Sequence, residues 1–201
     1  MSRTKTNLVS AVSILIGLAV SGQAMASNGY FAIGYGTKSK GMGGAGIAFP
    51  QDSLAAATNP AGQVFVGDRV DVGLNTLKTK ATETFLVGST VVFEEELDNQ
   101  YQVFPHFGYN GMLDPFSSIG VSLYTNDGIL SETPTSQLTL DQGFANFSYA
   151  RRIGEKSSLG GSILVAAQAF STNYDGSSAP ADSSFGYGLK LGWQGYLGGG
   201  V

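Results

Sequence analysis

The sequence contains no cysteine and a single histidine, His106, among its 201 residues. A disulfide framework and a thiolate metal site are therefore excluded, and so is a metal centre with several histidine ligands. Charged residues make up 13% of the chain, about half the roughly 25% of a typical soluble domain. The net charge is −4 and no basic cluster occurs, so nucleic acid is not expected as a partner. The sequence predicts no metal and no cofactor.

Glycine and aromatic residues are abundant instead. The chain has 29 glycines, about twice the average usage of roughly 7%. It also has 12 phenylalanines, 9 tyrosines and one tryptophan. It lacks the long apolar runs of a helical membrane protein, and its aromatic content and low charge do not fit a disordered chain.

Residues 1–26 have the pattern of a secretory signal. Arg3 and Lys5 provide a positively charged start, an apolar stretch runs from Leu8 to Val20, and Ala24-Met25-Ala26 is a cleavage site of small residues. The alternative is an N-terminal membrane anchor, which the short apolar stretch disfavours because a spanning helix needs about 20 residues. We expect export by the Sec pathway.

The segment from Ser27 to about Gly67 is rich in glycine and has one short helical pattern. Asp52 is the expected N-cap, Ser53 to Thr58 the helix, and Asn59-Pro60 its stop. Such a segment cannot form a core alone, so we expect it to pack against, or inside, another part of the protein.

From Arg69 onward, apolar residues alternate with small or polar ones, which predicts strands with one apolar face. The clearest example is the last strand, where large apolar residues alternate with glycines, Ser184 and Lys190. Its apolar positions are Phe185, Tyr187, Leu189, Leu191 and Trp193. Pro105 interrupts another strand, which we therefore expect to be bulged or kinked.

The connections between these strands alternate in length. Short turns are expected at Asn110–Pro115 and Ile153–Lys156, and long polar loops at 76–99, 125–136 and 171–183. Tight turns at one end and long loops at the other are typical of an outer-membrane β-barrel. A secreted β-sandwich is the alternative, but the low charge, high glycine content and large aromatics favour an all-β antiparallel transmembrane barrel.

Three further patterns have structural interpretations. Gly41-Met42-Gly43-Gly44-Ala45-Gly46 matches a dinucleotide fingerprint but follows no buried strand, so we interpret it as chance. His106 could serve an outer-membrane lipase, but no G-x-S-x-G motif accompanies it, and a lumen-facing histidine is the favoured interpretation. The acidic residues Glu94, Glu95, Glu96 and Asp98 are expected in a solvated loop, with divalent cations and lipopolysaccharide as a weaker alternative.

The N-terminal part resembles the FadL family, the outer-membrane transporters of long-chain fatty acids and aromatic hydrocarbons. Four motifs followed by a strand at Arg69–Leu74 carry the resemblance. They are Gly29-Tyr30-Phe31, Gly34-Tyr35-Gly36, Lys40–Gly46 and Asn59-Pro60-Ala61. The similarity continues more weakly to the end of the chain.

The resemblance implies a fourteen-stranded barrel with a lumenal hatch. Residues 27–67 would form the hatch, with Asn59, Pro60 and Ala61 as its motif. Tyr30 and Phe31 would lie near the substrate pocket, and Pro105 invites comparison with a strand kink that opens the barrel wall. The implied activity is passive transport of hydrophobic compounds across the Gram-negative outer membrane, without catalytic residues.

The length of the chain fits about half of such a barrel. Residues 68–201 provide six or seven strands, so we expect a partial transmembrane barrel that would be monomeric at full length, surrounded by outer-membrane lipid and lipopolysaccharide. The alternatives are a structural or adhesion barrel that transports nothing, or an inactive truncated fragment. Phe104 and Phe170 fall on the lumenal side of the alternation, which favours transport.

Overall fold

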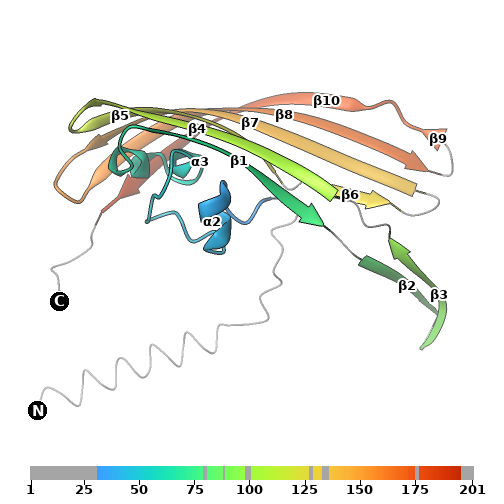
Figure 1. Cartoon of the computed structure of the whole chain (residues 1–201). Helices are drawn as coiled ribbons and strands as arrows, with labels where there is room; N and C mark the ends of the chain where they lie inside the picture. Colours follow the sequence, from blue (N-terminus) through green and yellow to red (C-terminus); the bar gives the residue numbers. More distant parts are fainter. Residues whose placement is uncertain are drawn as a thin grey trace, which may run out of the picture.

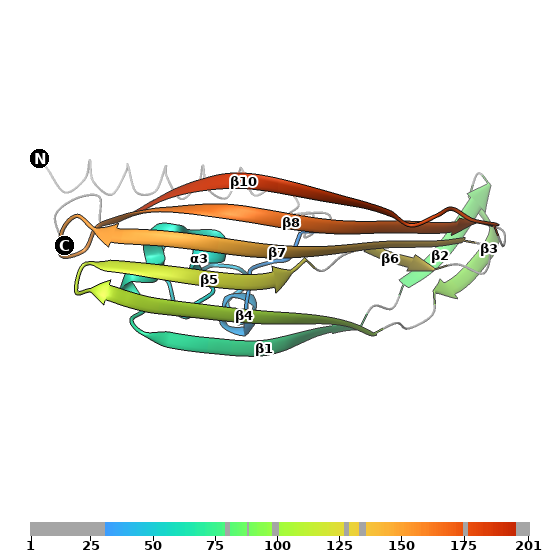
Figure 2. The ribbon, with the colours of Figure 1, turned by 90° about the horizontal axis from the view of Figure 1, so that it is seen from above.

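The structure is a computed structural model that describes residues 31–78, 81–87, 89–97, 101–126, 129–132, 136–174 and 177–195. The expected signal segment 1–26 and Tyr30 lie outside these residues. Six antiparallel strands form the main sheet in the order β1-β4-β5-β7-β8-β10 (Figure 2). They are β1 (Arg69–Lys78), β4 (Tyr101–Asp114), β5 (Ser117–Thr125), β7 (Ser136–Arg152), β8 (Ser158–Tyr174) and β10 (Asp182–Gln194). The all-β antiparallel class predicted from the two-residue period is confirmed.

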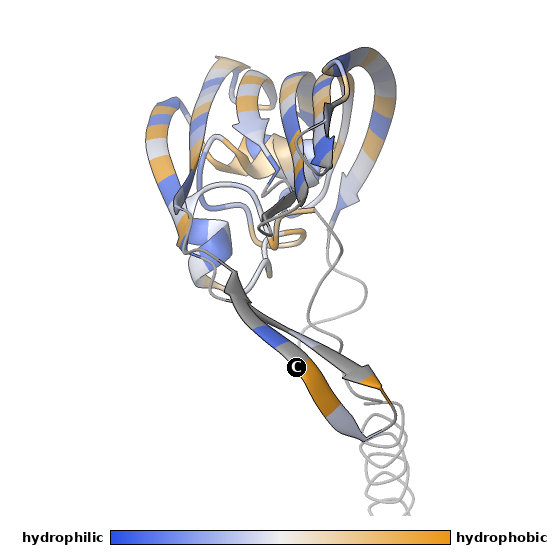
Figure 3. Cartoon of the chain, turned by 90° about the vertical axis from the view of Figure 1, so that its right-hand side faces the viewer, coloured by the Kyte–Doolittle hydropathy of each residue, from blue (hydrophilic) through white to orange (hydrophobic). Residues whose placement is uncertain are grey.

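The sheet is strongly curved and forms an open trough (Figures 1 and 3). Strands β1 and β10 are its two edges. The short strands β6 (Ile129–Glu132) and β9 (Ser177–Ser178) extend it beside β7 and β8. The described residues contain no helix that is long and apolar enough to cross a membrane.

The two faces of the sheet have the opposite polarity from those of a water-soluble protein. The convex face exposes large apolar side chains, with Tyr187 and Leu191 at 94% and 90% exposure. The concave face buries polar ones, and Asn110, Asn146 and Ser122 are fully inaccessible. Figure 3 shows the alternation as bands along each strand. An apolar exterior around a polar interior is the arrangement of a transmembrane barrel wall.

Residues 31–67, which we call the inner segment, lie on the concave side of the sheet (Figure 1). This segment contains α2 (Thr37–Gly41), α3 (Ala55–Thr58) and the 3-10 helix η1 (Pro60–Phe65). Only the second of these was expected from the sequence, because α2 and η1 are too short to show a helical apolar period.

The expected cap of α3 is wrong in detail. The helix begins at Ala55 with Leu54 as its N-cap. The carboxylate of Asp52 instead accepts a hydrogen bond from the backbone N–H of Leu54 at 3.1 Å, which is an Asx turn that precedes the helix. Asn59 ends α3 as expected, and it also caps the start of η1 by accepting the N–H of Ala61.

The long connections contain more strand than expected. The predicted loop at 76–99 holds the hairpin of β2 (Ala81–Val87) and β3 (Thr90–Leu97), so Glu94, Glu95 and Glu96 lie on a strand. Strand β6 lies in the predicted loop at 125–136, and β8 extends into the predicted loop at 171–183. Ser171, Thr172 and Asn173 place polar residues on both faces at the end of β8, which removes the alternation that reveals a strand.

Candidate functional site

The inner segment packs directly against the backbone of the sheet, where glycines on the concave face leave room for it. A side chain at Gly160 would place its Cβ 2.5 Å from the backbone nitrogen of Ala61. One at Gly192 would lie 3.0 Å from the ring of Pro60. Real Cβ atoms do not approach other atoms this closely, so these positions exclude any larger residue as long as η1 is in place.

Asn59 connects the inner segment to the far edge of the sheet. Its side-chain oxygen accepts the N–H of Ala61 at 3.1 Å. Its amide nitrogen donates to the carbonyl of Ile47 at 3.0 Å and to the carbonyl of Trp193 in β10 at 3.1 Å. One buried side chain therefore closes η1 and fixes it to a strand 134 residues away in the sequence.

Polar side chains on the concave face hold the remainder of η1. Asn110 of β4 donates to the carbonyls of Gln63 and Gly67 at 3.1 and 2.8 Å. Gln63 itself is fully buried, donates to the carbonyl of Ser118 at 3.2 Å, and accepts from the hydroxyl of Ser148 at 2.5 Å. These bonds satisfy groups that would be costly to bury unpaired, so the polar lumen serves to bind the inner segment.

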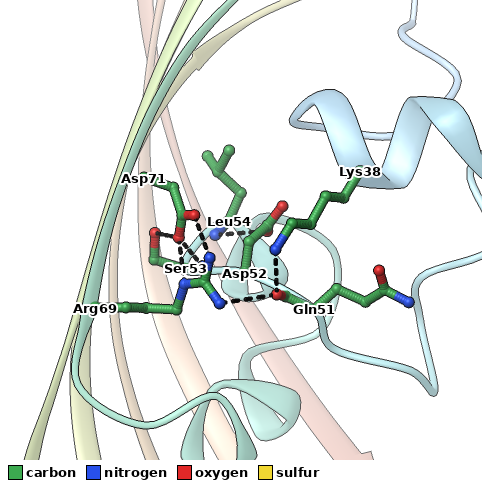
Figure 4. Close-up of polar contacts among 7 residues, drawn as sticks. All are labelled: Lys38, Gln51, Asp52, Ser53, Leu54, Arg69 and Asp71. Carbon is green, nitrogen blue, oxygen red and sulfur yellow. Dashed lines mark hydrogen bonds and ion pairs between the residues drawn. The ribbon is translucent and has the colours of Figure 1, made fainter.

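A charged cluster fixes the inner segment to the opposite edge of the sheet (Figure 4). Asp71 of β1 accepts hydrogen bonds from Arg69 at 2.5 and 2.7 Å. It also accepts the backbone N–H and the hydroxyl of Ser53 at 2.9 and 2.7 Å. Arg69 and Lys38 both donate to the carbonyl of Gln51. Both edges of the trough therefore hold the same segment.

Asp52 lies beside this cluster and is buried. Burial raises the pKa of its carboxyl group above the ordinary value of 3.8, and the nearby carboxylate of Asp71 adds to this effect. The hydrogen bond from Leu54 and the charges of Lys38 and Arg69 act in the opposite direction but do not cancel it. Asp52 is thus a carboxyl group for which burial favours the protonated form.

The wall has a break between β4 and β5. Strand β4 pairs with β1 in unshifted register through Pro105, which stands opposite Leu74. On its other side, the described pairing with β5 ends at Phe107 and Leu123. Proline has no N–H to donate to a ladder, which explains why pairing stops before it. The register shift of β4 opposite β5 lies elsewhere, between Met112 and Asp114, so no bulge occurs at Pro105 in the pairing that the structure describes.

A cavity of about 440 Å³ lies at this break, and we call it the apolar cavity. Its lining includes Leu74 and Leu123 from the convex face, together with His106 and Tyr124 from the concave face. The apolar cavity therefore takes its lining from residues of both faces of the sheet, at the point where the pairing of β4 with β5 stops. A second cavity of about 520 Å³, which we call the amide cavity, shares Thr125 and Gly143 with it and is lined by Gln102, Phe104, Asn126, Gln142 and Gln168 among others.

Aromatic side chains lie on the concave side of the apolar cavity. The rings of Tyr35 and Tyr124 are 4.2 Å apart, and Tyr124 stacks on Phe144 at 5.3 Å. Leu54 of the inner segment packs against the same cluster. The inner segment therefore packs behind Tyr124 and Phe144, two residues that line the apolar cavity.

No protein-family profile and no curated protein sequence matches the chain. Its structure is similar to that of the CymD monoaromatic hydrocarbon channel, with a TM-score of 0.61 and 19% sequence identity. The match covers 81% of this chain and 50% of that channel, so this chain spans about half the length of the channel. The chain therefore shares the fold of that channel over the matched part. The resemblance noted in the sequence is thus confirmed at the level of the fold, as is the partial barrel wall.

The structure brings some of the predicted site residues together. Asn59, Pro60 and Ala61 lie buried against Gly160 and Gly192. Phe31, which is 42% exposed, begins the described part of the inner segment, close to Ala32, whose N–H reaches Asn126 in the amide cavity. Pro105 lines the apolar cavity. Their functional roles stay predictions.

His106 has the structural role that the sequence favoured. Its buried ring faces Asn75 of β1, with Nδ1 3.4 Å from the side-chain nitrogen. Gly73 lies beside the ring and leaves space for it. The acidic residues of β3 lie in a separate hairpin, and no group of three or more metal-binding side chains occurs among the residues that the structure describes.

Sequence reasoning missed the groups that bind the inner segment. Asn110, Asn146 and Gln63 carry no recognisable motif, although each strand residue falls on the polar face of the alternation. The concave glycines could have been found, because Gly108, Gly120, Gly160 and Gly192 all share that face. Small residues on one face of successive strands indicate that another backbone packs there.

Proposed function

We propose that this chain forms part of an outer-membrane channel that conducts hydrophobic compounds passively, with the inner segment as its hatch. The observation that supports this most strongly is the apolar cavity, which takes its lining from both faces of the wall where β4 and β5 separate. A barrel that serves only as an anchor has no need for an opening there. The apolar convex face supports a location in the outer membrane.

An opening in the wall suits apolar cargo on energetic grounds. Moving an apolar molecule into a water-filled pore costs about 0.8 kcal/mol for each CH₂ group that becomes exposed to water. The apolar cavity would pass cargo sideways between the lumen and the bilayer without this cost. No energy source is required, because consumption inside the cell maintains the gradient.

The inner segment would close the direct path along the barrel axis. Its contacts with both edges of the trough, through Asn59 and through Ser53, would hold it across the lumen. Cargo that enters from the side of the long connections would then reach the aromatic cluster of Tyr35, Tyr124 and Phe144. From there the break beside Pro105 would be the nearest exit.

Obstruction of the opening tests this function. A Cβ added at Gly143 meets no atom within 4 Å, so Gly143→Trp can place a large ring at both cavities without forcing the backbone. Phe147→Trp is the matched control, because Phe147 lies on the same face of β7 as Gly143, is 51% exposed and lines neither cavity. Uptake of radiolabelled toluene and oleate is measured in cells that lack their own transporter of these compounds.

We expect Gly143→Trp to lower uptake at least about tenfold, corresponding to roughly 1.4 kcal/mol of added barrier, while Phe147→Trp matches the parent chain. Equal uptake by both variants would exclude the opening as the route. If the parent chain takes up neither compound while its heat-modifiable folded form is present in outer membranes, the structural barrel becomes the better assignment.

A further inference from the structure

Three side-chain amides form a chain across the concave side of the wall. The amide nitrogen of Asn126 donates to Oε1 of Gln142 at 2.8 Å. The amide nitrogen of Gln142 donates in turn to Oε1 of Gln168 at 2.6 Å. All three residues line the amide cavity, and the chain crosses from the end of β5 over β7 to β8.

The inner segment sets the direction of this chain. The side-chain oxygen of Asn126 accepts from the backbone N–H of Ala32 at 3.5 Å and from the hydroxyl of Tyr35 at 3.3 Å. A backbone N–H can only donate, so the oxygen of Asn126 must face Ala32 and its NH₂ group must face Gln142. The same argument then orients Gln142 and Gln168. Each amide presents its oxygen toward the inner segment and its NH₂ group away from it.

The far end of the chain is therefore an NH₂ group at Gln168. Among the described residues, no acceptor receives a hydrogen bond from it, whereas its oxygen is occupied by Gln142. Gln168 is half-buried and, like the buried Phe104, is among the residues that line the amide cavity. A donor in a cavity whose lining includes the buried ring of Phe104 fits an apolar molecule that carries one hydrogen-bond acceptor.

We infer that the amide cavity is a specificity subsite at which Gln168 donates a hydrogen bond to a neutral carbonyl oxygen on an otherwise apolar cargo molecule. This inference rests on the proposed function and narrows its substrate class to ketones, esters and similar compounds. Among the described lining residues, Asp141 is an acid and none is basic, so an anionic carboxylate is disfavoured. The ammonium of Lys40 lies over the ring of Phe104 at 5.3 Å but is outside the lining.

The test compares ligands of nearly equal size and shape. Acetophenone and ethylbenzene differ chiefly by one carbonyl oxygen, and benzoate carries a charge. Their binding to the purified full chain is measured by displacement of a fluorescent apolar probe. The quantity compared between variants is the ratio of ketone to hydrocarbon affinity, because differences in partitioning into detergent cancel in that comparison.

Two substitutions remove the donor in different ways. Gln168→Leu deletes the amide, and Gln168→Glu keeps its shape but replaces the NH₂ group with an acceptor. We expect both to lower the affinity ratio about threefold to tenfold, the effect of one neutral hydrogen bond, with ethylbenzene binding unchanged in Gln168→Leu. Gln137→Leu, which removes an exposed amide on β7 outside both cavities, is the control and keeps the parent ratio.

The outcomes separate this inference from the proposed function. An unchanged ratio in both Gln168 variants, with all ligands still bound, overturns the subsite but leaves the channel intact. Tighter binding of benzoate than of acetophenone to the parent chain overturns the preference for a neutral cargo. Failure of the folded parent chain to bind any of the three ligands contradicts the proposed function itself.

Discussion

Glycine has its clearest structural role at the positions where the inner segment touches the wall. Gly160 and Gly192 allow Pro60 and Ala61 to approach the strands more closely than any side chain would permit. Neither position needs an unusual backbone conformation, so the requirement is one of space alone. The same strands carry glycines that face nothing, such as Gly186, and these provide controls within the chain.

Gly160→Ala is expected to loosen the inner segment. Its new Cβ would lie 2.5 to 2.8 Å from the backbone of Pro60 and Ala61, so one of the two elements must move. Overpacking of this kind costs about 1 to 3 kcal/mol. Trypsin cleavage after Lys38 and Lys40 in the folded barrel measures how far the segment is displaced, and we expect the cleavage rate to rise.

Gly186→Ala is the matched control and should be cleaved at the parent rate. The comparison isolates the contact, because both variants add the same methyl group to the concave face of neighbouring strands. Equal protection of Lys38 and Lys40 in both variants would show that the inner segment is not held by its contact with Gly160.

At the scale of elements, the turn before α3 responds to pH through Asp52. Because burial raises the pKa of Asp52 in the folded protein above 3.8, protonation favours the docked segment. The stabilisation is complete below the ordinary pKa and is lost as the pH rises through the raised value.

We expect hydrogen exchange in the inner segment, corrected for its intrinsic pH dependence, to be slower at pH 4 than at pH 7. Asp52→Asn should remove this difference, because the amide is neutral at both pH values. Asp68→Asn, which neutralises an exposed carboxylate between the inner segment and β1, should retain it. A difference that persists unchanged in Asp52→Asn would assign the effect to another group.

The sequence predicted the strands that form the wall better than the elements that lie outside the wall. Val70, Val72 and Leu74 all face outward as their alternation predicted, because one face must meet lipid and the other must not. The hairpin β2–β3 and the end of β8 lie where the two faces of a strand do not differ in this way, so their residues show no clear alternation. The amide chain through Gln142 was equally hidden, because it depends on contacts between residues far apart in the sequence.

At the scale of the whole molecule, the convex face exposes large apolar side chains, as a lipid-facing wall does. Leu189 is 83% exposed in the middle part of β10, whereas Leu113 lies beside a short turn at one end of β4. An arginine on the lipid face costs about 2 to 4 kcal/mol at the middle of a bilayer but about 0 to 1 kcal/mol near its surface.

Leu189→Arg is therefore expected to destabilise the barrel in membranes much more than Leu113→Arg. Urea titration of the heat-modifiable folded form in lipid vesicles measures both variants against the parent chain. Equal losses would show that this face of β10 does not lie in the hydrocarbon layer, and the barrel wall would have to be placed differently relative to the membrane.

The contact between Asn59 and Trp193 has a consequence for the order in which the protein folds. The two residues are separated by 134 positions, and Lys190 likewise reaches the carbonyl of Ala57 across 133. Contacts of high sequence separation form slowly, because a long loop must close before they contribute. The segment synthesised first can thus complete its docking only after β10 has joined the sheet. Docking of the inner segment should therefore appear as a late kinetic phase of folding, after the strands of the wall have paired.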